Sequence, residues 1–158
     1  MNFIQGEVSA KHVNKIGIVV SRFNTPVTEK LEAGAIERAK ELGLTEDHMM
    51  LVRVPGAVEV PMAVQLLLEQ GCQGVAAIGA VIRGDTSHFD YVCNSVERGC
   101  TRLQLDYKKP VIFGVITTEN AEQAYDRCGG KKGHKGKEAI DTLLEMIDLH
   151  GILNKQKL

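Results

Sequence analysis

An apolar run at positions 74–82, with the sequence GVAAIGAVI, limits the possible folds of this chain more than any other feature. The run contains no polar alternation, which favours a strand buried on both faces of a parallel sheet. Beyond it, apolar side chains recur at three- and four-residue spacing from Phe89 to Leu103, the pattern of a helix with one buried face. Such a strand followed by such a helix predicts a βα unit of a layered α/β protein.

The same combination of strand and helix recurs along the chain. Apolar runs that predict further strands lie at positions 15–21, 49–54 and 111–118. Further helices are expected at positions 25–43, 61–71, 120–127 and 137–151. Thr25 is the expected N-cap of the first of these helices, and Gly151 is the expected end of the last. This alternation predicts a flavodoxin-like, three-layer α/β/α fold with a four-stranded parallel sheet.

Size, charge and cysteine content narrow the class of protein further. At 158 residues the chain fits a single domain, residues 1–158, that can bury its own core. The net charge is -1 and the isoelectric point is near 6.5, so the bulk charge favours neither nucleic acid nor a membrane as a partner. Because no apolar segment could span a bilayer and no secretion signal is recognised, we expect a cytoplasmic protein. The four cysteines form no C-x-x-C pair and are expected to be reduced and structural, with no metal site.

Two apolar features have no evident partner within the chain. Phe3, Ile4 and Val8 lie in a short N-terminal segment that could pair with a sheet edge of a neighbouring subunit or form a loose terminus. The expected helix at 61–71 is apolar nearly all round, from Met62 onward. Such a helix needs cover on more than one side, which predicts an oligomer.

Three of the predicted turns between a strand and a helix carry distinctive side chains. They lie at positions 22–24, 55–59 and 83–88. The carboxyl ends of parallel strands meet at one edge of the sheet, and ligands of such sheets bind there. We therefore expect the three turns to form one site.

The turn at 83–88 has the features of a phosphate site. Residues 83–88 lie between the carboxyl end of a strand and the amino end of a helix, where free backbone N–H groups and the helix dipole favour an anion. Alternatively, Asp85, Thr86 or Ser87 could simply cap the helix. His88 follows closely, and its imidazole could transfer a proton near neutral pH or have a structural role.

Other side chains also admit a functional and a structural interpretation. Phe23 could stack on a planar heterocycle or fold back onto the sheet. Glu59 could accept hydrogen bonds from a polyol or an amine, or stabilise the amino end of a helix. Arg127 could bind phosphate or complement the dipole at the end of its helix. The lysines between positions 131 and 137 are expected to form a solvated loop, because no aromatic residues lie among them as in a nucleic-acid surface.

A series of short motifs, in this order and spacing, resembles the 6,7-dimethyl-8-ribityllumazine synthase family of riboflavin biosynthesis. The resemblance runs nearly from end to end of the chain. The motifs that carry it are MNFIQG at 1–6, RFN at 22–24, VPGA at 54–57, GAVIRG at 79–84, HFDY at 88–91, PVIFG at 110–114, TTEN at 117–120 and KG at 135–136.

The resemblance implies a reaction and a set of site residues. The implied transferase reaction condenses 5-amino-6-(D-ribitylamino)uracil with 3,4-dihydroxy-2-butanone 4-phosphate to give the lumazine, phosphate and water, without a metal or an organic cofactor. It implies that Phe23 stacks on the pyrimidine and that His88 shuttles protons. The implied contacts to the pyrimidine edges and the ribityl chain come from Asn24, Ala57, Val58, Glu59, Val81 and Ile82. The implied phosphate site consists of Gly84, Asp85, Thr86 and Arg127.

The resemblance also implies an assembly. Sites of this family lie between neighbouring subunits of a pentamer, so Phe113, Arg127 and Lys135 would come from the adjacent chain. The loop at 129–135 resembles that of members whose pentamers form icosahedral capsids, and a riboflavin synthase could associate with such a shell.

Three residues depart from the family pattern. Val58 stands where an aromatic residue is usual, which would weaken packing over the ribityl chain. Asp85 places a carboxylate in the phosphate loop, although its N–H group could still donate. His134 replaces an asparagine beside Lys135 and adds a second titratable group.

Two other functions are compatible with this fold and these motifs. One is a pentameric riboflavin synthase, which would act on the lumazine alone. The other is a shell protein that binds a flavin precursor without turnover, and His88 together with Arg127 argues against it.

Overall fold

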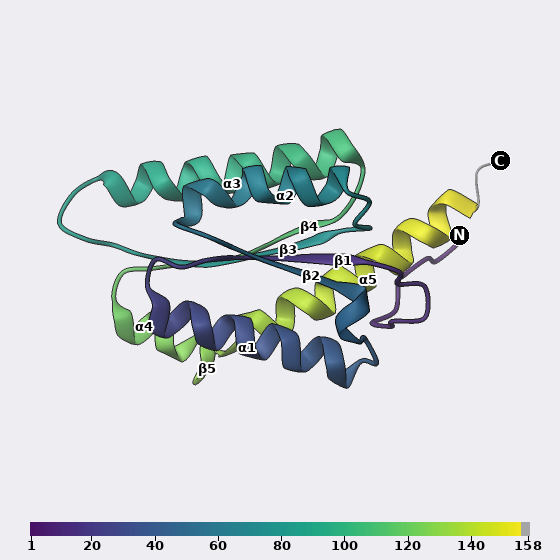
Figure 1. The fold of residues 1–158 in the computed structure, drawn as a ribbon, viewed down its shortest axis with the longest axis horizontal. Helices are drawn as coiled ribbons and strands as arrows, with labels where there is room; N and C mark the ends of the chain where they lie inside the picture. Colours follow the sequence, from purple (N-terminus) through teal and green to yellow (C-terminus); the bar gives the residue numbers. More distant parts are fainter. Residues whose placement is uncertain (156–158) are drawn as a thin grey trace.

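A computed structural model describes residues 1–155 as three layers, with a sheet between two layers of helices (Figure 1). The four strands of the sheet are all parallel and lie in the order β2-β1-β3-β4. They are β1 (Ile16–Ser21), β2 (Met49–Val54), β3 (Val75–Ile82) and β4 (Val111–Thr118). The predicted flavodoxin-like α/β fold and all four predicted strands are confirmed, with bounds that differ by one residue at most.

The helices divide between the two faces of the sheet. Helices α1 (Thr25–Glu41), α4 (Ala121–Asp126) and α5 (Lys135–Lys155) lie on one side, and α2 (Val60–Glu69) and α3 (His88–Tyr107) lie on the other (Figure 1). Two 3-10 turns, η1 (Glu46–His48) and η2 (Ala57–Glu59), and a small hairpin of β5 (Cys128–Gly130) and β6 (Gly133–His134) complete the described structure. None of the described helices combines the length and apolar character that a membrane span requires.

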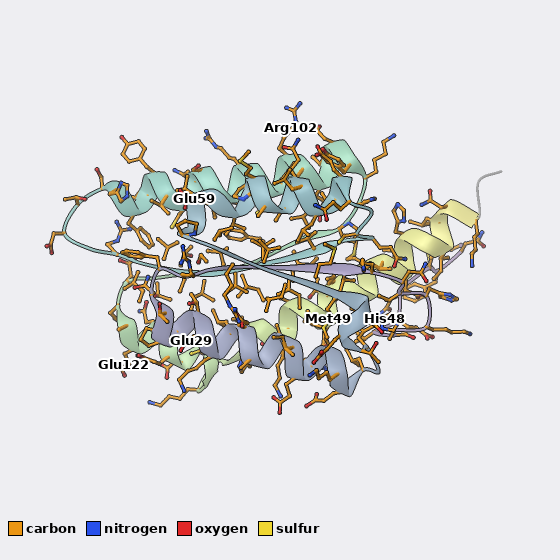
Figure 2. The ribbon with its side chains drawn as sticks, viewed as in Figure 1. Glu29, His48, Met49, Glu59, Arg102 and Glu122 are labelled. Carbon is orange, nitrogen blue, oxygen red and sulfur yellow. The ribbon has the colours of Figure 1, made fainter. Side chains whose placement is uncertain are left out.

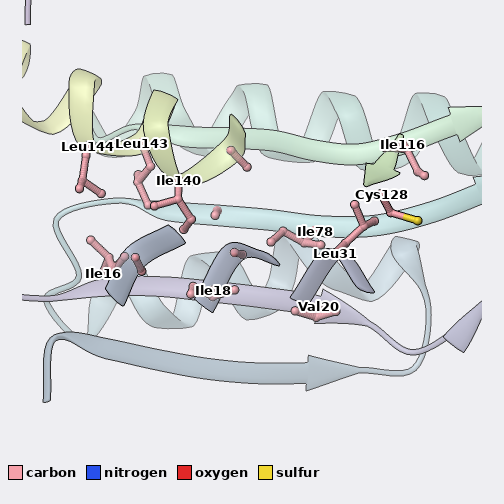
Figure 3. Packing of buried hydrophobic residues seen from close by; sticks show 14 of the residues in the cluster. Ile16, Ile18, Val20, Leu31, Ile78, Ile116, Cys128, Ile140, Leu143 and Leu144 are labelled. Carbon is pink, nitrogen blue, oxygen red and sulfur yellow. The ribbon is translucent and has the colours of Figure 1, made fainter. Parts of the chain in front are cut away.

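The core consists of two apolar clusters, one on each face of the sheet. Because successive side chains of a strand point to opposite faces, Ile18 and Ile78 pack toward α1 and α5, whereas Val19 and Ala77 pack toward α2 and α3. Figure 3 shows the first cluster, where Ile140 of α5 lies over the central strands. Burial on both faces is the reason for the continuous apolar runs of the strands.

Three predicted helix ends are wrong. The N-cap of α1 is Asn24 rather than Thr25, and Asn24 adopts the left-handed conformation with φ 66°. Asparagine tolerates this conformation better than most residues. The last helix begins at Lys135, two residues earlier than expected, and continues past Gly151 to Lys155. A glycine ends a helix only where the chain turns away, and α5 keeps its helical course at this position.

The predicted cap of α4 is confirmed. The side-chain oxygen of Asn120 accepts a hydrogen bond of 2.9 Å from the backbone N–H of Gln123. In return, the side chain of Gln123 accepts a hydrogen bond of 2.8 Å from the backbone N–H of Glu119. These bonds satisfy free donors at the start of the helix and hold the short segment that leads to Arg127.

The N-terminal segment lies along α5 of its own chain and contains no strand among the described residues. A Cβ atom at Gly6 would collide with the carbonyl of Glu145, so the backbone approaches α5 closely there. The N–H of Glu7 donates to Asp148 at 3.0 Å, while Phe3 is 81% exposed. Pairing of this segment with a neighbouring subunit stays a prediction.

Candidate active site

The three turns singled out in the sequence meet in one pocket of about 360 Å³ at the carboxyl end of the sheet. The pocket lies where β1 and β3 lead to helices on opposite faces, the usual ligand position in doubly wound sheets. Its lining residues are Phe23, Asn24, Gly56, Ala57, Val58, Glu59, Ala80, Val81, Ile82, Gly84, Thr86, His88, Phe89 and Val92. The structure thus brings together in one chain ten of the fourteen residues expected at the site.

The turn after β1 contributes an exposed ring and an anchored amide. Phe23 is 72% exposed, so its ring does not fold back onto the sheet. Asn24 donates a hydrogen bond of 2.9 Å from its side-chain nitrogen to the carbonyl of Ala80 on β3. This bond links the turn to the neighbouring strand and accompanies the left-handed backbone of Asn24. The unused oxygen and N–H of the amide remain able to bond a ligand.

The turn after β2 is closed by its own carboxylate. Glu59 accepts a hydrogen bond of 2.9 Å from the backbone N–H of Gly56, which shapes the 3-10 turn η2. Glu59 lies at the amino end of α2, and Figure 2 shows it on the side of the sheet that carries α3. Ala57 is buried in the pocket wall, and Val58 is half exposed beside it. The wall is therefore apolar, with one carboxylate at its margin.

The loop between β3 and α3 presents backbone groups and an imidazole. Gly84 and Thr86 line the pocket, whereas the exposed Asp85 does not. The hydroxyl of Thr86 accepts a hydrogen bond of 3.3 Å from the N–H of His88, the first residue of α3. A phosphate placed here would meet free N–H groups at the start of a twenty-residue helix.

Arg83 holds this loop in place, a role that the sequence did not reveal. Its guanidinium donates to Glu119 at 2.6 Å and to Asp90 at 3.1 Å, and it lies 4.2 Å from the centre of the Phe89 ring. These two carboxylates, Asp90 first, raise the pKa of Arg83 above its usual range. Since two acidic groups already match its charge, Arg83 is a clamp between the loop, α3 and the segment before α4.

Pocket residues absent from the sequence-based prediction include Gly56, Ala80, Phe89 and Val92. Phe89 and Val92 were assigned to the buried face of a helix, and their three-residue spacing does place them on one face. The sequence signal was correct, but it could not show that this face also forms the wall of a pocket.

Besides Asp85, three expected site residues do not line the pocket of their own chain. Phe113 lies on the edge strand β4. Arg127 follows α4 and donates to the carbonyl of Gln123 at 2.9 Å, and Lys135 pairs with Glu138 at 2.6 Å at the start of α5. Figure 1 shows α4 and the loop between β3 and α3 at the same end of the sheet, on opposite faces.

The described lining of the pocket in a single chain lacks a permanent positive charge that would balance an anionic ligand. Its lining contains the carboxylate of Glu59 and, within residues 1–155, no lysine or arginine. The thiols offer no nucleophile, because burial raises the pKa of Cys93 on α3 and raises that of Cys100 to about 12. No group of three potential metal-binding side chains occurs in the described part of the chain. The arrangement is suited to holding a planar, polar ligand and moving protons at His88.

Comparisons with known proteins agree with the motifs. The family model of 6,7-dimethyl-8-ribityllumazine synthase matches residues 14–151. A curated protein named 6,7-dimethyl-8-ribityllumazine synthase, from Bdellovibrio bacteriovorus, is 58% identical over 136 residues, which cover 85% of this chain and 74% of that protein. Matches of this extent establish membership, and the chain belongs to the 6,7-dimethyl-8-ribityllumazine synthase family.

Proposed function

We propose that this chain condenses 5-amino-6-(D-ribitylamino)uracil with 3,4-dihydroxy-2-butanone 4-phosphate to give 6,7-dimethyl-8-ribityllumazine, phosphate and water. The observation that carries the proposal is the pocket, in which an exposed aromatic ring, the start of a helix and one imidazole meet. Membership of the lumazine synthase family supports the same reaction.

The two substrates would occupy different parts of the pocket. The pyrimidine would stack on Phe23, with its edges at Ala57, Val81 and Ile82. The ribityl chain would bond Asn24 and Glu59 and pass over Val58, whose small side chain leaves that contact weaker than an aromatic ring would. The phosphate would bind at the N–H groups of Gly84, Asp85 and Thr86.

The reaction requires positioning and proton transfer. The pyrimidine amine attacks the ketone to form an imine with loss of one water, phosphate is eliminated, and ring closure with loss of a second water gives the lumazine. Holding two reactants in reacting geometry can supply roughly 7–11 kcal/mol of the barrier. His88 would transfer protons between these intermediates, a contribution of about 10²- to 10⁴-fold.

A neighbouring subunit would complete the site. A phosphate ester needs a cation, and the pocket of one chain has no lysine or arginine in its lining within the described residues. Arg127 would bind the phosphate and Phe113 and Lys135 would contact the other substrate from the adjacent chain of a pentamer. We also propose that such pentamers can form a capsid that associates with a riboflavin synthase, and that the free cysteines reflect a cytoplasmic location.

Product formation tests this proposal. The protein is incubated with both substrates, and the fluorescence of the lumazine product is followed while its mass in solution is measured. Synthesis by an oligomer is expected. Absence of lumazine would leave a binding shell without turnover, and riboflavin formed from lumazine alone would identify a riboflavin synthase of the same fold.

A further inference from the structure

His134 lies between helices α1 and α5, outside the pocket of its own chain. Its ring packs so closely on Gly34 of α1 that a Cβ atom there would overlap it. A Cβ atom at Gly136 of α5 would stand 3.1 Å from the same ring. The imidazole is therefore held by two glycine surfaces, one on each helix.

The ring also stands at the start of α5. His134 immediately precedes this helix, and its Nδ1 atom accepts a long hydrogen bond of 3.4 Å from the N–H of Lys137 in the first turn. This is the geometry of an N-cap, in which a side-chain acceptor satisfies an unpaired N–H group. An imidazole can fill that role only while Nδ1 carries no proton.

The capped turn contains Lys135 and is hydrogen-bonded to Arg127, the two cationic residues proposed for the adjacent site. Lys135 is the first residue of α5, and its backbone N–H donates to the carbonyl of Arg127 at 2.8 Å. Further along the helix, Ile140, Leu143 and Leu144 are fully buried. Loss of the cap would therefore loosen the first turn, with Lys135 and Arg127, while the body of α5 stays packed.

We propose that His134 is a positioning residue whose neutral imidazole caps α5 and thereby holds Arg127 and Lys135 for the phosphate substrate bound at the adjacent subunit. This inference rests on the proposed function. A proton on Nδ1 would replace the acceptor by a donor that faces the positive amino end of the helix. Phosphate binding is then expected to weaken as the pH falls.

The charged surroundings of the ring agree with a neutral state. Burial, followed by the ammonium group of Lys137 on α5, lowers the pKa of His134 below its ordinary 6.5. Hydrogen bonds to backbone groups of His134 and Lys30, and the carboxylate of Glu37 on α1, oppose that shift. The Cys128 thiol on the paired strand β5 is buried, and burial raises its pKa, so it is uncharged.

The lowered pKa of His134 sets the sign of the pH effect on stability. The unfolded histidine begins to bind a proton as the pH falls through about 6.5, before the folded one does. The stability contributed by neutral His134 is therefore complete above that pH and decreases below it.

The test compares the protein with His134→Asn, because the asparagine oxygen is a good N-cap acceptor that does not titrate. The KM for 3,4-dihydroxy-2-butanone 4-phosphate is measured for both proteins between pH 8 and pH 5.5. Titration of the substrate phosphate affects both proteins equally, so it cancels in the ratio of their KM values. We expect the KM of the original protein divided by that of the variant to rise about five-fold from pH 8 to pH 5.5, the typical effect of losing a cap.

Hydrogen exchange at the Lys137 amide, corrected for intrinsic pH dependence, gives a readout without turnover. Protection is expected to fall at pH 5.5 in the original protein and to persist in His134→Asn. A flat KM ratio would overturn the positioning role. If neither protein forms lumazine at any pH, the proposed function fails, and equal protection in both proteins at both pH values would separately overturn the cap.

Discussion

His88 is the one imidazole that lines the pocket, and it does so from the first residue of α3. Its side chain is exposed and the Thr86 hydroxyl bonds its backbone N–H, so the fold does not depend on the ring. We expect His88→Ala to lower kcat by about 10²- to 10⁴-fold with little change in melting temperature. Steady-state rates and thermal melts measure this. His150→Ala, an exposed histidine near the other end of α5, is the matched control, and equal rates in the two variants would remove the role of His88.

Arg127 is expected to bind the phosphate across a subunit boundary. A hydrogen bond from a charged group contributes about 1.5–3 kcal/mol, so Arg127→Ala should raise the dissociation constant of the phosphate substrate by about tenfold or more. Binding of the pyrimidine should change far less. Separate titrations with each substrate distinguish the two effects. Lys132→Ala removes the same charge from the same hairpin region and should bind both substrates normally; equal losses for both substrates in Arg127→Ala would contradict a phosphate contact.

At the level of single residues, side-chain chemistry was predictable and contacts were not. Phe23 was identified because an aromatic ring is unusual in such a turn, and His88 because an imidazole beside an anion site could transfer a proton; both line the pocket. The role of Arg83 was not identified, because its partners Glu119 and Asp90 lie far from each other in sequence and meet it only in the folded chain.

At the level of elements, close packing of α1 against α5 depends on glycines, which have no side chain to separate the helices. A Cβ atom at Gly136 would collide with the carbonyl of Leu31, whereas one at Gly151 of the same helix would meet nothing within 4 Å. We expect Gly136→Ala to destabilise the protein by roughly 1–3 kcal/mol through overpacking.

Gly151→Ala is the control on the same helix. It should stabilise the protein by about 0.5–1 kcal/mol, because alanine favours a helix over glycine. Urea unfolding of both variants at one protein concentration measures the difference. Equal shifts of the same sign would show that helix propensity, and not contact between α1 and α5, governs Gly136.

Two of the misplaced helix ends show where local signals fail. Thr25 followed by Pro26 is a normal start signal, but the bond from Asn24 to Ala80 on β3 fixes the turn one residue earlier. Gly151 is a normal stop signal, but α5 continues through it. A cap signal acts within a few residues, whereas the start of α1 depends on a contact with a strand distant in sequence.

At the level of the whole molecule, an apolar surface remains uncovered in a single chain. Met62 and Leu66 on α2 are 71% and 49% exposed, and they lie one turn apart on one face. We expect Leu66→Lys to weaken subunit association, because a charge would replace an apolar contact.

Light scattering should show a smaller mass for Leu66→Lys and, in parallel, lumazine synthesis should fall, since Arg127 and Lys135 of the adjacent chain would leave the site. Asp47→Lys changes an exposed charge in η1 and should leave both the mass of the oligomer and the rate of lumazine synthesis unchanged. An unchanged mass for Leu66→Lys would exclude this face from the interface.

The order of strands and helices, the parallel sheet and the family of the chain followed from the sequence by itself. Apolar runs and helical spacing are local patterns, and burial on both faces leaves few arrangements that satisfy them. Only the tertiary structure decided which side chains share the pocket, that Arg83 clamps its loop and that His134 stands at the head of α5. Those features depend on contacts between segments far apart in the chain, and a sequence pattern does not say how close such segments lie in space.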